Sequence, residues 1–448
     1  MTTMTTFPRS TPAALGIDSR GVLALLDALE STPDVEPHSI MLLRHGQVAA
    51  EGWWQPYTAH RVHLLYSLSK SFTAAGVGIA VRAGLIDLDA TVLSYFPELD
   101  ADVTDERSRR IRVRHLLAMA SGHREETLDR AEALDPTNTV RGFLLLPPDE
   151  EPGTVFAYNQ PCTYTLAAIV RRVTGGSLVD WLRPRLLDPL GIDDLAWRRD
   201  DTGAELGYSG CYATTDAVAK LGQLYLQRGV WAGGRILDED WVEQATGTRV
   251  ANPDEGNPDW SQGYGFQFWM ARHGFRGDGA YGQFCVVLPE QDVVLAITGQ
   301  SLDMQAVLDA VWQHLLPAVD RASDAASDAA LEAKLASLGL PAVSGAALQG
   351  LDDVGPLARV GDGWRLTLDV EGGTLSVPVG QGEWAVEGPL AACGAVVDDG
   401  AAVHVDLRFV ETPHLAHVRI AVPSGDVALA WATEPLHDGP MTLRRPAD

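Results

Sequence analysis

One serine and one lysine, Ser67 and Lys70, stand three residues apart, a spacing at which one side chain can activate the other. The chain has only three lysines, and neither Lys220 nor Lys334 has a serine three residues before it. A serine hydroxyl becomes a good nucleophile when a neighbouring base takes its proton. Lysine can be that base once burial lowers its pKa, whereas arginine keeps its proton at any useful pH. The pair therefore predicts nucleophilic catalysis through Ser67, with Lys70 as the base.

The elements around this pair are predicted to place both side chains on one side of a helix. Residues 40–55 contain two β-rich runs around Gly46, which favours a hairpin ahead of Ser67. From residue 67 onward, apolar residues recur at helical spacing, and Gly84 is placed to end the helix. Ser67 is therefore expected at a helix start, with an unpaired backbone N–H, and Lys70 one turn further on the same side.

The rest of the pattern divides the chain into three predicted parts, of which the first is residues 1–318. Further helices are predicted within it at residues 161–174, 178–187, 214–229, 238–246 and 303–318. A meander of strands is predicted at residues 263–270, 280–288 and 293–298.

The two parts that follow differ from it in composition. Residues 319–340 are rich in alanine and acidic residues, which is typical of a helical linker. In residues 341–448, apolar and polar residues alternate with period two, which predicts a C-terminal antiparallel β domain, either a barrel or a sandwich. We expect no catalytic group in this domain, and we expect His414 and His417 at its surface.

The overall composition is that of a globular protein with an acidic surface. The 448 residues are 46% hydrophobic and carry a net charge of -26. This charge argues against nucleic acid and against an anionic membrane as partners, since both attract basic surfaces. The opening residues lack the features of a secretion signal, and no apolar stretch approaches the roughly 20 residues of a membrane span. We therefore predict a cytoplasmic protein with neither partner.

No residue pattern predicts a metal or another cofactor. The four cysteines form no Cys-x-x-Cys motif, so core thiols are expected rather than a zinc cage or a disulfide framework. His60 and His63 have a spacing that a metal tolerates, and His115 and His123 lie near the predicted site. No acidic residue completes a zinc motif such as His-Glu-x-x-His. We therefore predict that the chain uses no metal and no cofactor.

Around these residues the sequence resembles the serine β-lactamase/DD-peptidase superfamily, in particular the class C β-lactamase-like group of esterases, D-peptidases and amide hydrolases. The resemblance covers about residues 15–318. It rests on Ser67 and Lys70 together with ordered landmarks at residues 84–90, 113–122, 188–191 and 219–231. It implies an α/β (α+β) fold, in which a β-lactamase/transpeptidase-like antiparallel sheet has helices on both faces and an all-helical subdomain beside it.

The resemblance also implies a role for a second motif, Tyr-x-Asn in the family. It aligns with Tyr158 and Gln160. Tyr158 would be the proton shuttle, as the third catalytic residue beside Ser67 and Lys70. Gln160 replaces the asparagine but still offers an amide, one methylene further out, for the usual contact to the lysine or the substrate.

A third family motif, Lys-Thr-Gly or His-x-Gly, aligns with residues 277–279, where the usual cation or histidine is missing. The resemblance implies that Asp278 and Gly279 contact the substrate. It also implies an oxyanion hole made of the backbone N–H groups of Ser67 and Ala280. The glycines of this motif would let a substrate approach the strand closely, although a hairpin turn explains them as well.

The function that follows from the resemblance is a serine hydrolase that forms a Ser67 acyl-enzyme on a small ester, amide or peptide substrate, as a carboxylesterase, amidase or peptidase does. Three alternatives stay open: a penicillin-binding-protein-like thioesterase or acyltransferase that cyclises or transfers a peptide acyl group, a weak β-lactamase or DD-peptidase, and an inactive binding or scaffold protein. The missing cation of the third motif disfavours a β-lactamase or DD-peptidase. An α/β-hydrolase is disfavoured because residues 207–211 miss the Gly-x-Ser-x-Gly pattern. The sequence indicates no oligomeric state.

Overall fold

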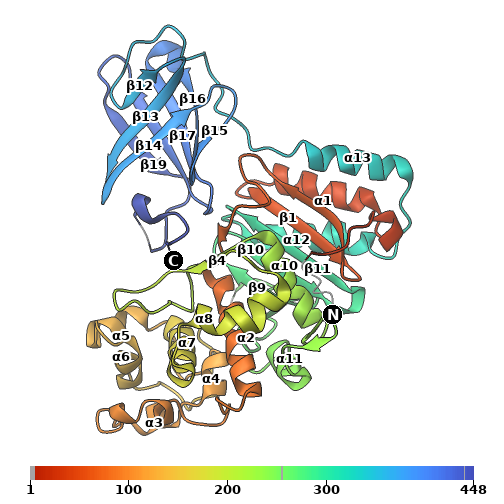
Figure 1. Cartoon of the computed structure of the whole chain (residues 1–448), viewed down its shortest axis with the longest axis vertical. Helices are drawn as coiled ribbons and strands as arrows, with labels where there is room; N and C mark the ends of the chain where they lie inside the picture. The colour runs from red at the N-terminus through yellow and green to blue at the C-terminus, as the bar shows by residue number, and fades with distance from the viewer. Residues whose placement is uncertain (1–5, 254–255, 438, 448) are drawn as a thin grey trace.

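A six-stranded antiparallel sheet lies at the centre of the larger part of the protein (Figure 1). The computed structural model describes residues 6–253, 256–437 and 439–447. The strands of the central sheet, in their spatial order, are β2 (Gln47–Trp53), β1 (Pro37–Arg44), β11 (Val293–Gly299), β10 (Gln283–Leu288), β9 (Phe275–Gly279) and β8 (Trp269–Met270). The predicted hairpin at Gly46 is confirmed as β1 and β2.

Both faces of this sheet are covered, which explains why its inner strands are apolar throughout rather than alternating. On one face, Leu42 and Leu295 pack with α1 (Ser19–Ser31) and α12 (Met304–Ala310). On the other face, Leu43 and Val294 share a core with α2 (Ser69–Arg82) and α10 (Thr215–Leu226). The predicted fold, an antiparallel sheet between helical layers, is confirmed.

A helical region lies beside the sheet, at the lower end of the molecule in Figure 1. Its helices are α3 (Glu106–Arg110), α4 (Val113–Leu117), α5 (Leu128–Leu134), α6 (Thr139–Leu145), α7 (Gln160–Thr174), α8 (Leu178–Leu182) and α9 (Asp188–Leu190). Helix α11 (Glu239–Ala245) follows α10. Two small sheets join the region to the rest: β3 (His63–Leu64) with β5 (Cys211–Ala213) and β4 (Leu195–Trp197), and the pair β6 (Val230–Trp231) and β7 (Gly234–Arg235).

The predicted helices are confirmed, but one predicted strand is wrong. Of residues 263–270 only β8 is a strand, because Gly263 and Gln267 have positive φ angles of 105° and 62°, which interrupt an extended chain. The strand predicted at 280–288 begins only at Gln283, since Tyr281 also has a positive φ. Within the central sheet, the strand that was not predicted is β9, whose glycines make its sequence look like a turn.

Helix α13 (Ala325–Ala336) forms within the predicted linker and packs on the body through Leu331. The chain beyond it builds two antiparallel sheets around one apolar core. The first holds β12 (Leu357–Val360), β13 (Gly363–Val370) and β14 (Gly373–Val379), and the second holds β15 (Ala385–Glu387), β16 (Leu390–Val397), β17 (Ala402–Phe409), β18 (Leu415–Ala421) and β19 (Val427–Trp431). Their inward positions are the apolar members of the period-two pattern.

The end of the chain turns back to the larger part of the protein. Arg445 donates to Asp194 just before β4, near the C-terminus marked in Figure 1. All four cysteines are buried and unpaired, as predicted. Among the helices of the described residues, none combines the length and the apolar character that a membrane crossing requires.

Candidate active site

Ser67 lies where the chain enters the helix that carries Lys70. A short 3-10 helix, η2 (Tyr66–Leu68), runs directly into α2, so Ser67 is at a helix start as predicted. Its side chain is partly exposed and can be reached from solvent. The preceding residue, Tyr66, has a φ of 47°, an uncommon conformation for a bulky residue. The backbone therefore turns sharply just before the serine.

Lys70 is 1% exposed, and its ammonium group has three neutral oxygen acceptors. Its Nζ donates to Ser67 Oγ at 3.0 Å, to Gln160 Oε1 at 2.6 Å and to the Tyr208 carbonyl at 2.9 Å. The last two are carbonyl oxygens, which only accept hydrogen bonds. Once the amine is neutral, its two N–H groups can stay on these carbonyls, and its lone pair is then left for the Ser67 hydroxyl.

Burial lowers the pKa of Lys70 from its usual 10.5 to about 7. The negative charges of Asp278 and Glu126 act in the opposite direction, but they do not offset the loss of water. A substantial fraction of Lys70 is therefore neutral near pH 7. This is the protonation state that a general base requires.

Tyr158 lies against the same amine. Lys70 Nζ is 4.6 Å from the centre of the Tyr158 ring, and that ring stacks on Trp269 at 5.2 Å. Burial raises the pKa of Tyr158, the charge of Asp278 raises it further, and a hydrogen bond with Ser67 acts in the opposite direction. The phenol therefore keeps its proton and contacts the serine.

Gln160 is the first residue of α7 and meets Lys70 in the way expected of the family asparagine. The neighbouring Asn159 is fully buried and points elsewhere, since its Oδ1 accepts from the backbone N–H and the hydroxyl of Thr127, both at 3.0 Å. The structure thus brings Ser67, Lys70, Tyr158 and Gln160 together.

The glycines at 277 and 279 lie within β9 and face the helix that carries Ser67. A Cβ atom on Gly279 would be 2.0 Å from the Leu65 carbonyl oxygen, and one on Gly277 would be 2.5 Å from Leu68 Cδ1. Such contacts leave no room for a side chain, so the glycines permit β9 to pack directly on η2. The hairpin-turn explanation is wrong. Ala280, which follows β9 directly, consequently lies beside the turn at Ser67.

Asp278 forms a buried ion pair with Arg276 on the same strand. Arg276 Nε donates to Asp278 Oδ2 at 3.1 Å and Arg276 Nη1 donates to the Asp259 carbonyl at 2.6 Å. Burial raises the pKa of Asp278 and lowers that of Arg276, and each charge offsets part of this effect on the other. The arginine nearest the third motif is thus engaged by Asp278 rather than presented to solvent.

Several groups at the site were missed by sequence reasoning. Tyr208 contributes its carbonyl oxygen, and no side-chain pattern can reveal a backbone acceptor. His414 was expected at the surface, which is wrong: it is fully buried and lies 2.6 Å from the Tyr66 hydroxyl. The two residues are 348 positions apart, so their spacing carried no signal. His417, by contrast, is partly exposed.

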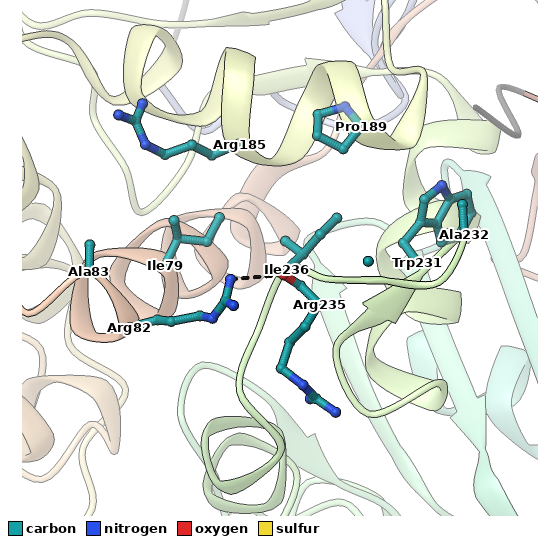
Figure 2. Close-up of a pocket in the computed structure, with 10 residues that line it drawn as sticks. Ile79, Arg82, Ala83, Arg185, Pro189, Trp231, Ala232, Arg235 and Ile236 are labelled. Atoms are coloured by element: carbon teal, nitrogen blue, oxygen red, sulfur yellow. Dashed lines mark hydrogen bonds between the residues drawn. The ribbon is translucent and has the colours of Figure 1, made fainter. Parts of the chain in front are cut away.

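Cavities lie near both ends of α2. One of about 640 Å³ is lined by Tyr208, His437 and the chain end around Arg444, and it adjoins Lys70 through Tyr208. The other, of about 620 Å³, is shown in Figure 2 between α2, the helical segment with Arg185 and Pro189, and β7, where Arg82 donates to the Arg235 carbonyl. No residue of the candidate site lines the second cavity.

Among the residues that the structure describes, one group of side chains could hold a metal ion, on β17 and β18. His404, Asp406 and His417 place their ligand atoms within 4.8 Å of one another. Sequence reasoning missed this group because it joins two strands. His404 Nε2 and His417 Nδ1 lie 2.8 and 2.6 Å from Asp406 Oδ1, so one nitrogen of each ring already has a hydrogen-bond partner without an ion.

Comparisons with known proteins agree with this geometry. The family model described as Beta-lactamase matches residues 31–317, a range that holds every candidate site residue. The 6-aminohexanoate-dimer hydrolase of Paenarthrobacter ureafaciens is 32% identical over 305 residues, which are 60% of this chain and 76% of that enzyme. A lovastatin esterase of Penicillium rubens is 30% identical over 205 residues, 40% of this chain and 51% of that protein.

The fold has a match among solved structures. A penicillin-binding protein homologue from Caulobacter crescentus superposes with a TM-score of 0.53 at 18% identity, over 67% of this chain and 99% of that one. At this identity, the match supports the fold alone.

Proposed function

Because the chain belongs to the β-lactamase family, we propose that it is a serine hydrolase in which Ser67 forms an acyl-enzyme with an amide or ester substrate. The observation that carries this proposal is the environment of Lys70. A lysine surrounded by two carbonyl oxygens and one hydroxyl can give up its proton, and the hydroxyl is the only one of the three that can supply a proton in return.

In the proposed acylation, Ser67 Oγ forms a bond to the substrate carbonyl carbon while its proton moves to Lys70 Nζ. The carbonyl oxygen becomes an oxyanion, which the N–H groups of Ser67 and Ala280 stabilise. The intermediate then expels the amine or alcohol, which receives the proton from Lys70 through the Tyr158 hydroxyl. In deacylation, water attacks the acyl-enzyme, the same groups take up its proton, and the acid leaves as Ser67 regains its hydrogen.

We propose amides and esters of short linear acids as substrates rather than β-lactams. The relative at 32% identity is named as a 6-aminohexanoate-dimer hydrolase, and the relative at 30% is named as an esterase. The third motif supports the same choice, since Asp278 neutralises Arg276 and leaves no unpaired cation on β9 for the carboxylate of a β-lactam. In this proposal Asp278 and Gly279 form the wall against which the substrate lies.

We also propose the division of the chain at residues 318 and 340. The cores on the two faces of the central sheet are built almost entirely from residues before 341. The third core is built from residues 348–443. The cytoplasmic location stays a prediction from composition.

The experiment is to label the protein with a fluorophosphonate, locate the adduct by mass spectrometry, and measure turnover of short nitrophenyl esters and linear amides. An adduct on Ser67 and loss of turnover in Ser67→Ala are expected, with Ser94→Ala, an exposed serine, as the control. Turnover that persists in Ser67→Ala would contradict the proposal. Product masses separate hydrolysis from acyl transfer, because both use the same residues.

A further inference from the structure

Two tyrosines flank the two proposed oxyanion donors. Tyr66 directly precedes Ser67, and Tyr281 directly follows Ala280. Both have left-handed backbone conformations, with φ of 47° and 67°. Their rings meet edge to face at 5.6 Å. Such conformations are costly for bulky residues and persist where the surroundings hold them.

The groups that hold them lie in segments that flank the C-terminal strands, just before β18 and just after β19. The Tyr66 hydroxyl lies 2.6 Å from His414 Nε2, and the Tyr281 hydroxyl donates to the Glu434 carbonyl at 2.6 Å. The His414 ring also packs against both tyrosine rings, with centres 5.9 and 5.5 Å away. One histidine thus contacts both sides of the proposed oxyanion hole.

The tautomer of His414 follows from its other contact. Its Nδ1 lies 3.0 Å from the Thr433 carbonyl, which only accepts, so Nδ1 carries the proton and donates. Nε2 is then the acceptor, and the Tyr66 hydroxyl donates to it. Burial lowers the pKa of His414 to about 4, which keeps the ring neutral near pH 7.

The loop between β17 and β18 adds two more contacts to the same segment. The Leu64 N–H donates to the Glu411 carbonyl at 2.8 Å, and the Tyr57 hydroxyl donates to the Thr412 carbonyl at 3.1 Å. Four contacts from the C-terminal sheets and their flanking segments therefore reach the residues that lead into Ser67 or leave Ala280.

We propose that the C-terminal β region is part of the active site, where His414 is a positioning residue that fixes Tyr66 and Tyr281 and so the separation of the Ser67 and Ala280 N–H groups. This proposal rests on the oxyanion hole in the proposed function. Oxyanion stabilisation depends on donors placed beforehand at the position of the developing charge, so a small displacement of either N–H lowers the rate. Substrate binding in the ground state depends less on that placement.

The test compares Tyr66→Phe, His414→Phe and His414→Gln. Tyr66→Phe removes one hydroxyl from a buried ring and His414→Phe removes the acceptor, and each is expected to lower kcat about 10- to 100-fold with KM changed less than about threefold. His414→Gln restores an acceptor near the position of Nε2 and should recover part of the rate. Phenylboronic acid, whose tetrahedral adduct on Ser67 places an oxygen in the oxyanion hole, should bind more weakly by a similar factor.

His417→Phe is the matched control, since His417 lies three residues further along, on β18, and contacts Asp406 instead of the tyrosines. It should keep the parent kcat and the parent affinity for the boronic acid. If Tyr66→Phe and His414→Phe, folded by circular dichroism, also keep both, the positioning role is wrong. That result would leave the proposed function intact provided Ser67→Ala is inactive, so the two failures are distinguishable.

Discussion

Two buried cations in this protein have opposite surroundings. Lys70 is 1% exposed, its ammonium group donates to three neutral oxygens, and burial lowers its pKa to about 7. Arg408, on β17, is 2% exposed and lies against Glu36, whose two oxygens accept from it at 2.7 and 2.9 Å. There the opposite charges hold the pKa of Glu36 well below and that of Arg408 above the usual values.

The partners of a buried cation therefore indicate whether it stabilises the fold or takes part in proton transfer. A buried cation with a buried counter-ion keeps its charge and ties two parts of the fold together. A buried amine with neutral acceptors keeps the hydrogen bonds but loses the charge when a proton is needed elsewhere. Lys220 also has a counter-ion: it is almost fully buried, and Asp216, one turn earlier on α10, lies 2.7 Å from its Nζ.

Lys70→Arg should have the largest effect. Arginine keeps the positive charge but cannot act as a base, so kcat should fall at least about 1,000-fold with the fold retained. Steady-state kinetics and a thermal melt measure the two quantities. Lys220→Arg is the control and should change kcat less than about threefold. Comparable losses in the two variants would show that Lys70 is merely structural.

Arg408→Gln removes the ion pair with Glu36 and should lower the stability of the fold rather than the catalytic rate. It leaves Glu36 without its counter-ion, which should lower the free energy of unfolding by about 3 kcal/mol at pH 7. The loss should shrink towards pH 4, since Glu36, which then keeps the His38 ring but has lost Arg408, takes up a proton there. Denaturant unfolding at both pH values measures this.

The matched control for that experiment is Arg365→Gln on the same part of the chain. Arg365 pairs with Glu387 at 2.8 Å at an exposed site, so its loss should cost less than about 1 kcal/mol. Equal losses in Arg408→Gln and Arg365→Gln would show that burial adds nothing to the pair.

The pH dependence of acylation should report the neutral form of Lys70. With a pKa of about 7, kcat/KM should rise about tenfold per pH unit below pH 7 and level off above it. The direction follows because a base acts in its deprotonated state. The measurement uses a neutral ester from pH 5 to 9, with thermal melts at each pH. A flat profile would mean that deprotonation of Lys70 does not control acylation between pH 5 and 9.

The sequence predicted the side chains of the site better than the backbone that arranges them. Ser67 and Lys70 could be found because one helical turn fixes their distance, and Tyr158 and Gln160 because they follow a family motif. The role of Gly279 could not be found, since its close approach to Leu65 depends on tertiary packing.

The contact of His414 with the residues before Ser67 could not be predicted from the sequence either. His414 stands in a strand-edge pattern that suits a surface residue equally well. Its burial follows from the docking of one group of sheets on another part of the chain, and local pattern does not encode this docking. Glu36 and Arg408 meet across the same junction, 372 residues apart.

Gln160→Glu should have the smallest effect on rate at pH 7. It tests most directly whether the absence of a counter-ion is what distinguishes Lys70 from Arg408. The exchange places a carboxylate where Gln160 Oε1 now lies, 2.6 Å from Lys70 Nζ, and so gives the lysine the counter-ion that Arg408 has. An opposite charge at this distance raises the pKa of a lysine by about one unit or more. We expect kcat/KM to fall about tenfold at pH 7 and to recover by about pH 9, with the whole profile moved to higher pH.

Gln160→Met, which removes the acceptor without adding charge, is the control and should lower the rate without moving the profile to higher pH. If Gln160→Glu loses activity equally at every pH, the neutral surroundings of Lys70 do not set its pKa, and the distinction between the two sites fails.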